Sequence, residues 1–113
     1  MNKVFVVHHQ KRFDEKKGVL VETHDLTPAS EYGKLVYLLP HHASPLSPDK
    51  WIPVLQSGLT SYTRDDYLLL VGNPSLIAWA AALAADESEG YLKLLQWERE
   101  EKRYQVVEAD LCM

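Results

Sequence analysis

One stretch decides the fold, namely Tyr67-Leu-Leu-Leu-Val-Gly72-Asn-Pro-Ser-Leu-Ile-Ala-Trp-Ala-Ala-Ala-Leu-Ala-Ala85. Its first part, Tyr67–Val71, is apolar throughout, which is typical of a strand covered on both faces. Gly72 then predicts a sharp turn, and Asn73-Pro74 supplies a helix cap and a residue suited to the first helical position. A helix over Ser75–Ala85 should follow at once. This strand–turn–helix unit predicts an α/β protein with parallel strands.

Composition places the 113-residue chain among ordinary single-domain proteins, with 46% hydrophobic and 25% charged residues. The net charge of −4 gives no long-range attraction to phosphate backbones, so we expect no nucleic-acid partner. No apolar run approaches the length of a membrane span, and the start of the chain lacks the apolar region of a signal peptide. The single cysteine, Cys112, cannot form an internal disulfide. We therefore expect one cytoplasmic domain over residues 1–113 that does not bind membranes.

The N-terminal third predicts two strands around a charged loop. Val4–Val7 is a short apolar run that suits a buried strand. The charged segment Gln10–Gly18 predicts a hairpin loop, after which Val19–Thr23 should return as an antiparallel strand. One helical turn over Pro28–Tyr32 and a further apolar strand over Leu35–Leu39 follow.

The rest of the chain predicts a helix and a terminal hairpin around the opening unit. A helix should lie within Asp49–Ser61, but its start stays open. Ser47-Pro48-Asp49 is a good N-terminal signal, whereas Pro53 would kink a helix that begins so early and could itself mark the start. Glu89-Gly90 should close the helix over Ser75–Ala85. Tyr91–Trp97 and Tyr104–Ala109 then predict an antiparallel hairpin near a sheet edge.

The long connections between the strands fix their relative direction. A crossover with a helix joins Leu35–Leu39 to Tyr67–Val71, and another joins the latter to Tyr91–Trp97, so these strands should be parallel. Val4–Val7 is parallel to them if Val19–Thr23 runs back between. The predicted fold class is therefore α/β, a mixed and mostly parallel sheet with helices packed on it and antiparallel hairpins at the N- and C-terminal ends. The order of the strands stays open.

The carboxyl ends of the parallel strands are where an open α/β sheet binds ligands. Four of the five histidines fall at this predicted edge, beside the start of a helix whose free N–H groups favour an anion. A small-anion or nucleotide site here would use Gly72, Asn73, Ser75, His8, His9, His41 and His42. No complete phosphate-binding motif is present, and the alternative is that the turn only reverses the chain and caps the helix.

Neither a metal site nor a catalytic site is predicted. Adjacent histidines on a strand point to opposite faces, so each pair offers one ligand per face, whereas zinc needs three or four. The serines lack a nucleophile elbow, and Asp65-Asp66 precedes its strand at the far end of the sheet. We therefore expect no cofactor and favour binding over catalysis.

The expected outer face of the Ser75–Ala85 helix consists of alanines, namely Ala78, Ala81, Ala82 and Ala85. Alanine has the highest helix propensity, and exposed alanines carry little cost. The same small residues would let another helix approach closely, either within the domain or across a homodimer. Both interpretations stay open.

Several segments together resemble short uncharacterised proteins of phages and mobile elements: Asp25-Leu-Thr-Pro-Ala-x-Glu31-Tyr-Gly33, Leu38-Leu-Pro40, Asp66-Tyr-Leu-Leu-Leu-Val-Gly72-Asn-Pro74 and Leu95-x-Trp97. The resemblance covers most of the chain and implies a genomic setting, with no activity and no functional residue. We expect an accessory or regulatory protein that binds an unidentified host or phage protein, in the form of a monomer or a homodimer. The alternative is the small-anion or nucleotide binder.

Overall fold

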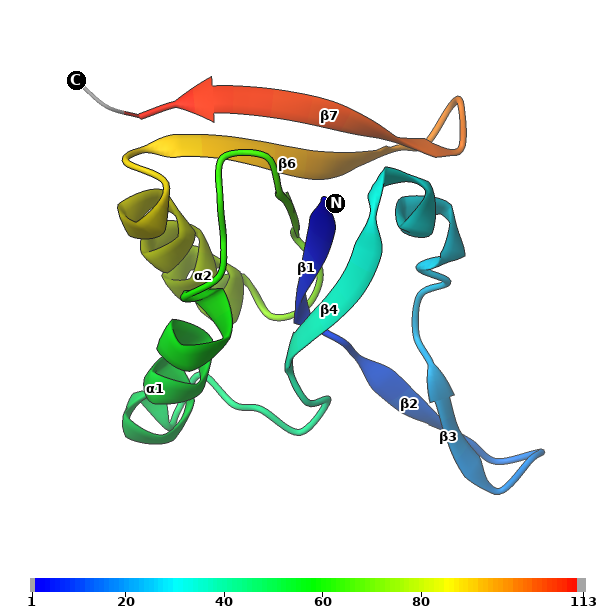
Figure 1. The fold of residues 1–113 in the computed structure, drawn as a ribbon. Helices are drawn as coiled ribbons and strands as arrows, with labels where there is room; N and C mark the ends of the chain where they lie inside the picture. The colour runs from blue at the N-terminus through cyan, green and yellow to red at the C-terminus, as the bar shows by residue number, and fades with distance from the viewer. Residues whose placement is uncertain (1, 112–113) are drawn as a thin grey trace.

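The computed structural model describes residues 2–111. Its main sheet has five strands in the order β4-β1-β5-β6-β7 (Figure 1). The first four in this order are mutually parallel, and the last is antiparallel to its neighbour. The predicted fold class, a mixed and mostly parallel sheet with helices, is confirmed. The strand bounds are β1 Lys3–His8, β4 Lys34–Leu39, β5 Tyr67–Leu69, β6 Tyr91–Glu98 and β7 Arg103–Asp110.

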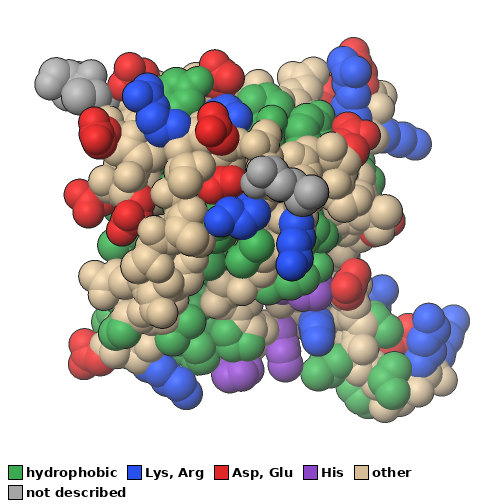
Figure 2. Space-filling model, viewed as in Figure 1, with side chains coloured by type: hydrophobic (Ala, Val, Ile, Leu, Met, Phe, Trp, Pro, Cys, Tyr) green, Lys and Arg blue, Asp and Glu red, His purple; other side chains and the backbone are tan. Residues whose placement is uncertain are grey.

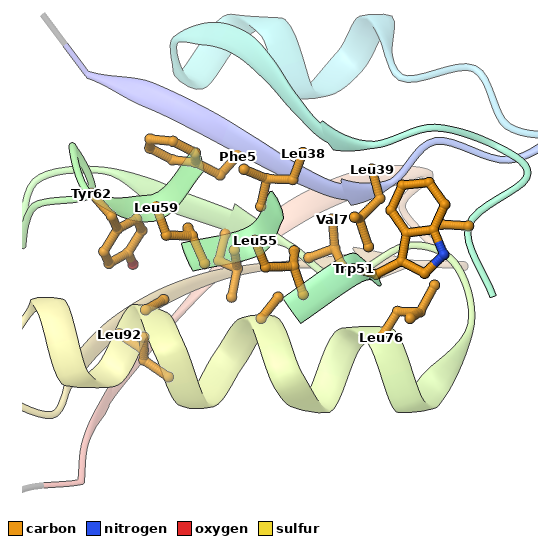
Figure 3. Packing of buried hydrophobic residues seen from close by; sticks show 14 residues of the cluster. Phe5, Val7, Leu38, Leu39, Trp51, Leu55, Leu59, Tyr62, Leu76 and Leu92 are labelled. Carbon is orange, nitrogen blue, oxygen red and sulfur yellow. The ribbon is translucent and has the colours of Figure 1, made fainter. Parts of the chain in front are cut away.

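Two helices cover one face of the sheet: α1 (Pro48–Leu59) and α2 (Pro74–Glu87). Both lie on the same side in Figure 1 and contact each other as well as the strands. Figure 3 shows the cluster between them and the sheet. It contains side chains from both layers, including Phe5, Val7, Leu55, Leu59, Leu68, Leu76 and Ala80. Burial of this apolar area stabilises the layer by about 25 cal/mol per Å².

A short 3-10 helix, η1 (Thr27–Tyr32), packs on the opposite face. The hydroxyl of Tyr32 donates a hydrogen bond to the carbonyl oxygen of Tyr104, 2.7 Å away. The second cluster contains Val4, Val6, Leu26, Ala29, Leu69, Leu95 and Tyr104. Alternate residues of β1 thus enter opposite clusters, because successive side chains of a strand point to opposite faces. That explains why this strand is apolar without alternation.

The N-terminal hairpin differs from the prediction. A short strand β2 (Lys11–Asp14) lies inside the segment predicted as a loop, Gln10–Gly18, which is a correction. Strand β3 (Val19–Glu22) pairs with β2 in a separate two-stranded sheet and not with β1. The reason is that β1 already has a parallel neighbour on each side, β4 and β5, so no edge is left for a returning strand. The parallel direction of β1 itself is confirmed.

Helix α1 begins at Pro48, so the alternative start near Pro53 was wrong. Pro53 lies inside the helix, where it lacks the N–H that would bond the previous turn. Trp51 explains why the early turn forms nevertheless. Its side chain is buried, and its N–H donates to the Ser47 carbonyl at 3.2 Å. Tertiary packing therefore overrides the proline at this point.

The ends of the other elements shift slightly. Strand β5 ends at Leu69, two residues before the predicted end at Val71, and α2 continues to Glu87. The buried carboxylate of Asp66 accepts hydrogen bonds from the Lys3 N–H, the Thr63 N–H and the Thr63 hydroxyl at 2.9, 2.9 and 3.0 Å. It thereby fixes the loop before β5 to the start of β1. Within the described part of the chain, no helix is long and apolar enough to cross a membrane.

Candidate functional site

His8 joins the carboxyl ends of three neighbouring strands. It is buried at the end of β1, where Nδ1 accepts a hydrogen bond from the Asn73 N–H at 3.1 Å. Its Nε2 lies 3.1 Å from the carbonyl oxygen of His41, which follows β4. A backbone N–H can only donate and a carbonyl can only accept, so the proton of this imidazole lies on Nε2. Both ring nitrogens are used within the protein.

Gly72 makes room for this imidazole. Its φ is +110°, a conformation that glycine adopts without strain. A Cβ at this position would lie 2.2 Å from the Cβ of His8. The close approach that suggested a ligand is therefore made by a side chain of the protein itself.

The start of α2 uses its own free donors. Asn73 is the cap, and its Oδ1 accepts the Ser75 N–H at 2.9 Å, as the cap prediction required. Pro74 has no N–H, and the Asn73 N–H is bonded to His8. These internal bonds occupy the Asn73 and Ser75 N–H groups, two of the donors that could bind an anion at a helix start. A ligand-binding role of Gly72, Asn73 and Ser75 stays a prediction.

The other histidines of the predicted edge point to different neighbours. The ring of His9 stacks on Tyr37 of β4 at 4.7 Å, and its Nε2 lies 3.3 Å from the Glu22 carboxylate of β3. His42 contacts Trp51 edge-on at 5.5 Å. Histidines gather beside the hairpin in Figure 2. The His8 side chain thus meets Gly72 and Asn73, whereas His41 takes part through its backbone carbonyl and its ring lies edge-on to that of His42 at 5.6 Å. In residues 2–111, no group of three or more His, Cys, Asp or Glu side chains could hold a metal ion.

A groove of about 620 Å³ lies on the η1 side of the sheet, at the carboxyl ends of β5 and β6. Asp25 lies at this groove, and the Thr27 backbone N–H lowers the pKa of its carboxyl group. The carboxylate is negative at neutral pH, and this charge disfavours an anion in the groove. Sequence reasoning missed most of the residues that line this groove, because the segment after β3 reaches it only through the fold. The lining consists of Gln10, Thr23, His24, Asp25, Pro28, Leu69, Leu70, Val71, Gly72, Leu95, Gln96, Trp97 and Tyr104.

The β2–β3 hairpin projects from the body beside this groove (Figure 1). A second groove of about 350 Å³ separates its other side from β4. Phe13, Val19 and Leu20 are 60%, 52% and 49% exposed, although each is large and apolar. Phe13 and Leu20 are cross-strand partners, so they share one face of the hairpin. The sequence carried little signal for β2, because Phe13 is the one apolar residue among Lys11–Asp14.

Comparison with known families identifies the family of the chain. A model of the family described as phage Pam3 gp32-like protein matches residues 2–111. The chain belongs to this family. The predicted resemblance to short phage proteins is therefore confirmed. No curated protein and no solved structure matches the chain.

The alanines of α2 in this phage-family protein divide into two pairs. Ala81 and Ala85 are partly buried against the cluster between the helices and the sheet. Ala78 and Ala82 are exposed. A close helix neighbour therefore exists within the chain, namely α1, while an interface across a dimer stays a prediction.

Proposed function

We propose that this phage-family protein is an accessory or regulatory factor that binds a protein partner in the cytoplasm of the infected cell. The contact surface is the β2–β3 hairpin. The observation that carries the proposal is the exposure of Phe13, Val19 and Leu20 on an element that projects from the body. Exposed apolar side chains gathered on one feature are typical of interaction sites.

The β2–β3 hairpin has little stability of its own. An isolated two-stranded hairpin is marginally stable in water. The main contacts of β2 and β3 are with each other, while both sides face grooves. Its base is nevertheless fixed to the body, because the ring of His9, which contacts Glu22 at 3.3 Å, lies on Tyr37 of β4 at 4.7 Å. The hairpin is thus held in place at its base with its apolar residues presented to a partner.

Charge indicates what kind of surface the partner offers. Four exposed cations surround the apolar side chains of the hairpin, namely Lys11, Arg12, Lys16 and Lys17. The hairpin also carries three carboxylates: Asp14, which accepts the Lys16 and Lys17 N–H groups, the exposed Glu15, and Glu22, which lies 3.3 Å from His9. Four cations against three carboxylates leave the hairpin net positive. The expected partner is a protein with an apolar patch rimmed by carboxylates.

The test is cross-linking capture in infected host cells with a tagged protein, followed by mass spectrometry. The double variant Phe13→Ser and Leu20→Ser should lose at least tenfold of the captured partner. Leu46→Ser is the matched control, because Leu46 is 89% exposed but lies before α1, and it should capture the partner as the native protein does. Unfolding curves of both variants should match the native curve. Undiminished capture by the double variant would exclude the hairpin as the contact.

The rival function is binding of a small anion or nucleotide at the carboxyl edge. The geometry favours it less, because His8 and Asn73 bond to each other and the Asp25 charge lies at the adjacent groove. In a thermal-shift panel of phosphate, nucleotides and divalent metals, we expect no change of the melting temperature. A stabilising compound whose effect disappears in Asn73→Ala or His41→Ala would establish the rival instead.

A further inference from the structure

Strand β7 forms an uninterrupted outer edge of the main sheet. Its residues pair with β6 in one continuous register from Arg103 to Asp110, without a bulge and without proline. Bulges, prolines and very short strands are the devices that usually block an edge from pairing with another chain. Figure 1 shows β7 along one side of the molecule with no element beyond it.

The direction of its free backbone groups follows from one hydrogen bond. The Leu111 N–H donates to the Gly90 carbonyl at 2.7 Å, one step beyond the β6–β7 register. Because bonded and non-bonded pairs alternate along an antiparallel ladder, the odd-numbered residues of β7 turn their N–H and C=O groups toward β6. The groups of Tyr104, Val106 and Glu108 therefore turn outward. The hydrogen bond from the Tyr32 hydroxyl to the Tyr104 carbonyl agrees with this assignment.

The middle of this edge is apolar on both faces of the sheet. Val106 is 39% exposed and Val107 is 44% exposed, and as neighbours in a strand they point to opposite faces. A second strand laid along β7 would cover both side chains and would pair with the outward N–H and C=O groups of Val106 and Glu108, whereas the Tyr104 carbonyl is already bonded to Tyr32. This is the geometry of strand addition.

We propose that the occupant is β7 of a second copy, paired antiparallel about a twofold axis at Val106 or Val107. The two five-stranded sheets then form one continuous sheet. The charges along the strand favour this occupant, because β7 is preceded by Lys102, begins with Arg103 and carries acidic residues in its last part, Glu108 and Asp110. Antiparallel self-pairing sets the basic end of each strand beside the acidic end of the other.

The charges and backbone directions also limit the register. A twofold axis perpendicular to the sheet pairs outward residues with outward residues. With the axis at Glu108, two carboxylates would face each other, which is unfavourable. With the axis at Val106 or Val107, no like charges are direct partners. The Arg103–Glu101 ion pair at 2.6 Å lies at the hairpin tip and can remain.

The β7 interface does not involve the β2–β3 hairpin, so either proposal can be disproved without affecting the other. Such a dimer would carry two β2–β3 hairpins, and a partner with two sites would then be bound more tightly through effective concentration. The proposal replaces the alanine face of α2 with the sheet edge as the homodimer surface. Ala82 is exposed and supplies the competing variant.

The test is sedimentation velocity over a hundredfold range of concentration, with paired charge variants. The native chain should shift from monomer to dimer mass as its concentration rises. Val106→Glu and Val106→Lys should each weaken self-association at least tenfold, and an equimolar mixture of the two should restore it. The variants Val107→Glu and Val107→Lys are tested in the same way. The twofold axis lies at the residue whose mixed variants restore self-association more strongly.

Two controls keep the outcome decisive. Leu46→Lys introduces a charge at an exposed apolar residue elsewhere and should leave the mass unchanged. Ala82→Lys tests the helix face and should also leave it unchanged. A native chain that stays monomeric over the whole range would overturn the proposal. It would also be overturned if only Ala82→Lys abolished the dimer while the Val106 and Val107 variants, shown to be folded by circular dichroism, retained it.

Discussion

His8 and Gly72 depend on each other. The imidazole bonds two partly buried backbone groups, the Asn73 N–H and the His41 carbonyl. A fully buried group left unpaired costs about 1–3 kcal/mol, and the partial exposure here makes the cost smaller. The arrangement works only because residue 72 has no side chain. Two hydrogen bonds of one side chain thus connect three strand ends.

We predict that Gly72→Ala is strongly destabilising. The added Cβ would lie 2.2 Å from His8, and φ of +110° is strained for any other residue. Overpacking and backbone strain together should lower the free energy of unfolding by about 3 kcal/mol or more. Gly18→Ala is the matched control, because its φ is also positive, +66°, but nothing lies within 4 Å. Urea unfolding should show a loss of only about 1 kcal/mol for the control. Equal losses would mean that the His8 contact contributes nothing.

The sequence located this site but not its use. Strand ends and the helix cap could be predicted because apolar runs, Asn73 and Pro74 act locally. The bonds of His8 could not, since Asn73 and His41 meet it only after β1, β4 and β5 are aligned. A histidine at a strand end offers the same pattern to a ligand and to the backbone. Only the three-dimensional neighbours distinguish the two.

At the level of elements, α1 shows packing overriding a local preference. Pro53 interrupts the backbone hydrogen bonds of the helix, yet the helix forms because the side chains of Trp51, Leu55 and Leu59 are buried together against the sheet. The hairpin shows the reverse case. Little packing from outside β2 and β3 shapes their sequence, so Lys11–Asp14 lacks a strand-like alternation and its charges favoured a loop.

We predict that Pro53→Ala stabilises the protein. Alanine restores an N–H for the hydrogen bond of the previous turn, and Pro53 is exposed, so no buried contact is lost. The free energy of unfolding should rise by about 1 kcal/mol, less than the roughly 3 kcal/mol of an unadapted helix interior. Gln56→Ala, at another exposed position of α1, should change it by only a few tenths. A destabilised Pro53→Ala variant would show instead that the proline ring supports the helix.

At the scale of the whole molecule, the sheet carries one buried phenol on each face. Tyr62 lies in the cluster beneath α1 and α2, edge-on to Phe5 at 5.5 Å, and Tyr104 lies in the cluster beneath η1. Burial raises the pKa of both phenols above the ordinary value of 10.0. Both faces of the sheet therefore contain a phenol whose deprotonation at high pH opposes folding.

We predict that the protein loses stability above about pH 10. There the tyrosines of the unfolded chain release their protons, while Tyr62 and Tyr104 in the folded chain still hold theirs, so rising pH favours unfolding. The loss approaches about 1.4 kcal/mol per pH unit for each phenol until the folded pKa is reached. Urea unfolding at pH 8 and above pH 10 measures it. The Tyr62→Phe and Tyr104→Phe variants should lose less over this interval, whereas Tyr37→Phe, which removes an exposed phenol, should behave as the native chain does.

Strand β1 lies inside the sheet, between β4 and β5, and this position affects how the chain can fold during synthesis. Val4 is synthesised well before its partners in the sheet, Leu35 and Tyr67. A nascent chain must therefore carry an exposed apolar strand until β5 has been made, a state that invites aggregation or chaperone binding. Pairings between residues so far apart in sequence also make folding slow. We expect overproduced chains that end before β5 to accumulate as aggregates.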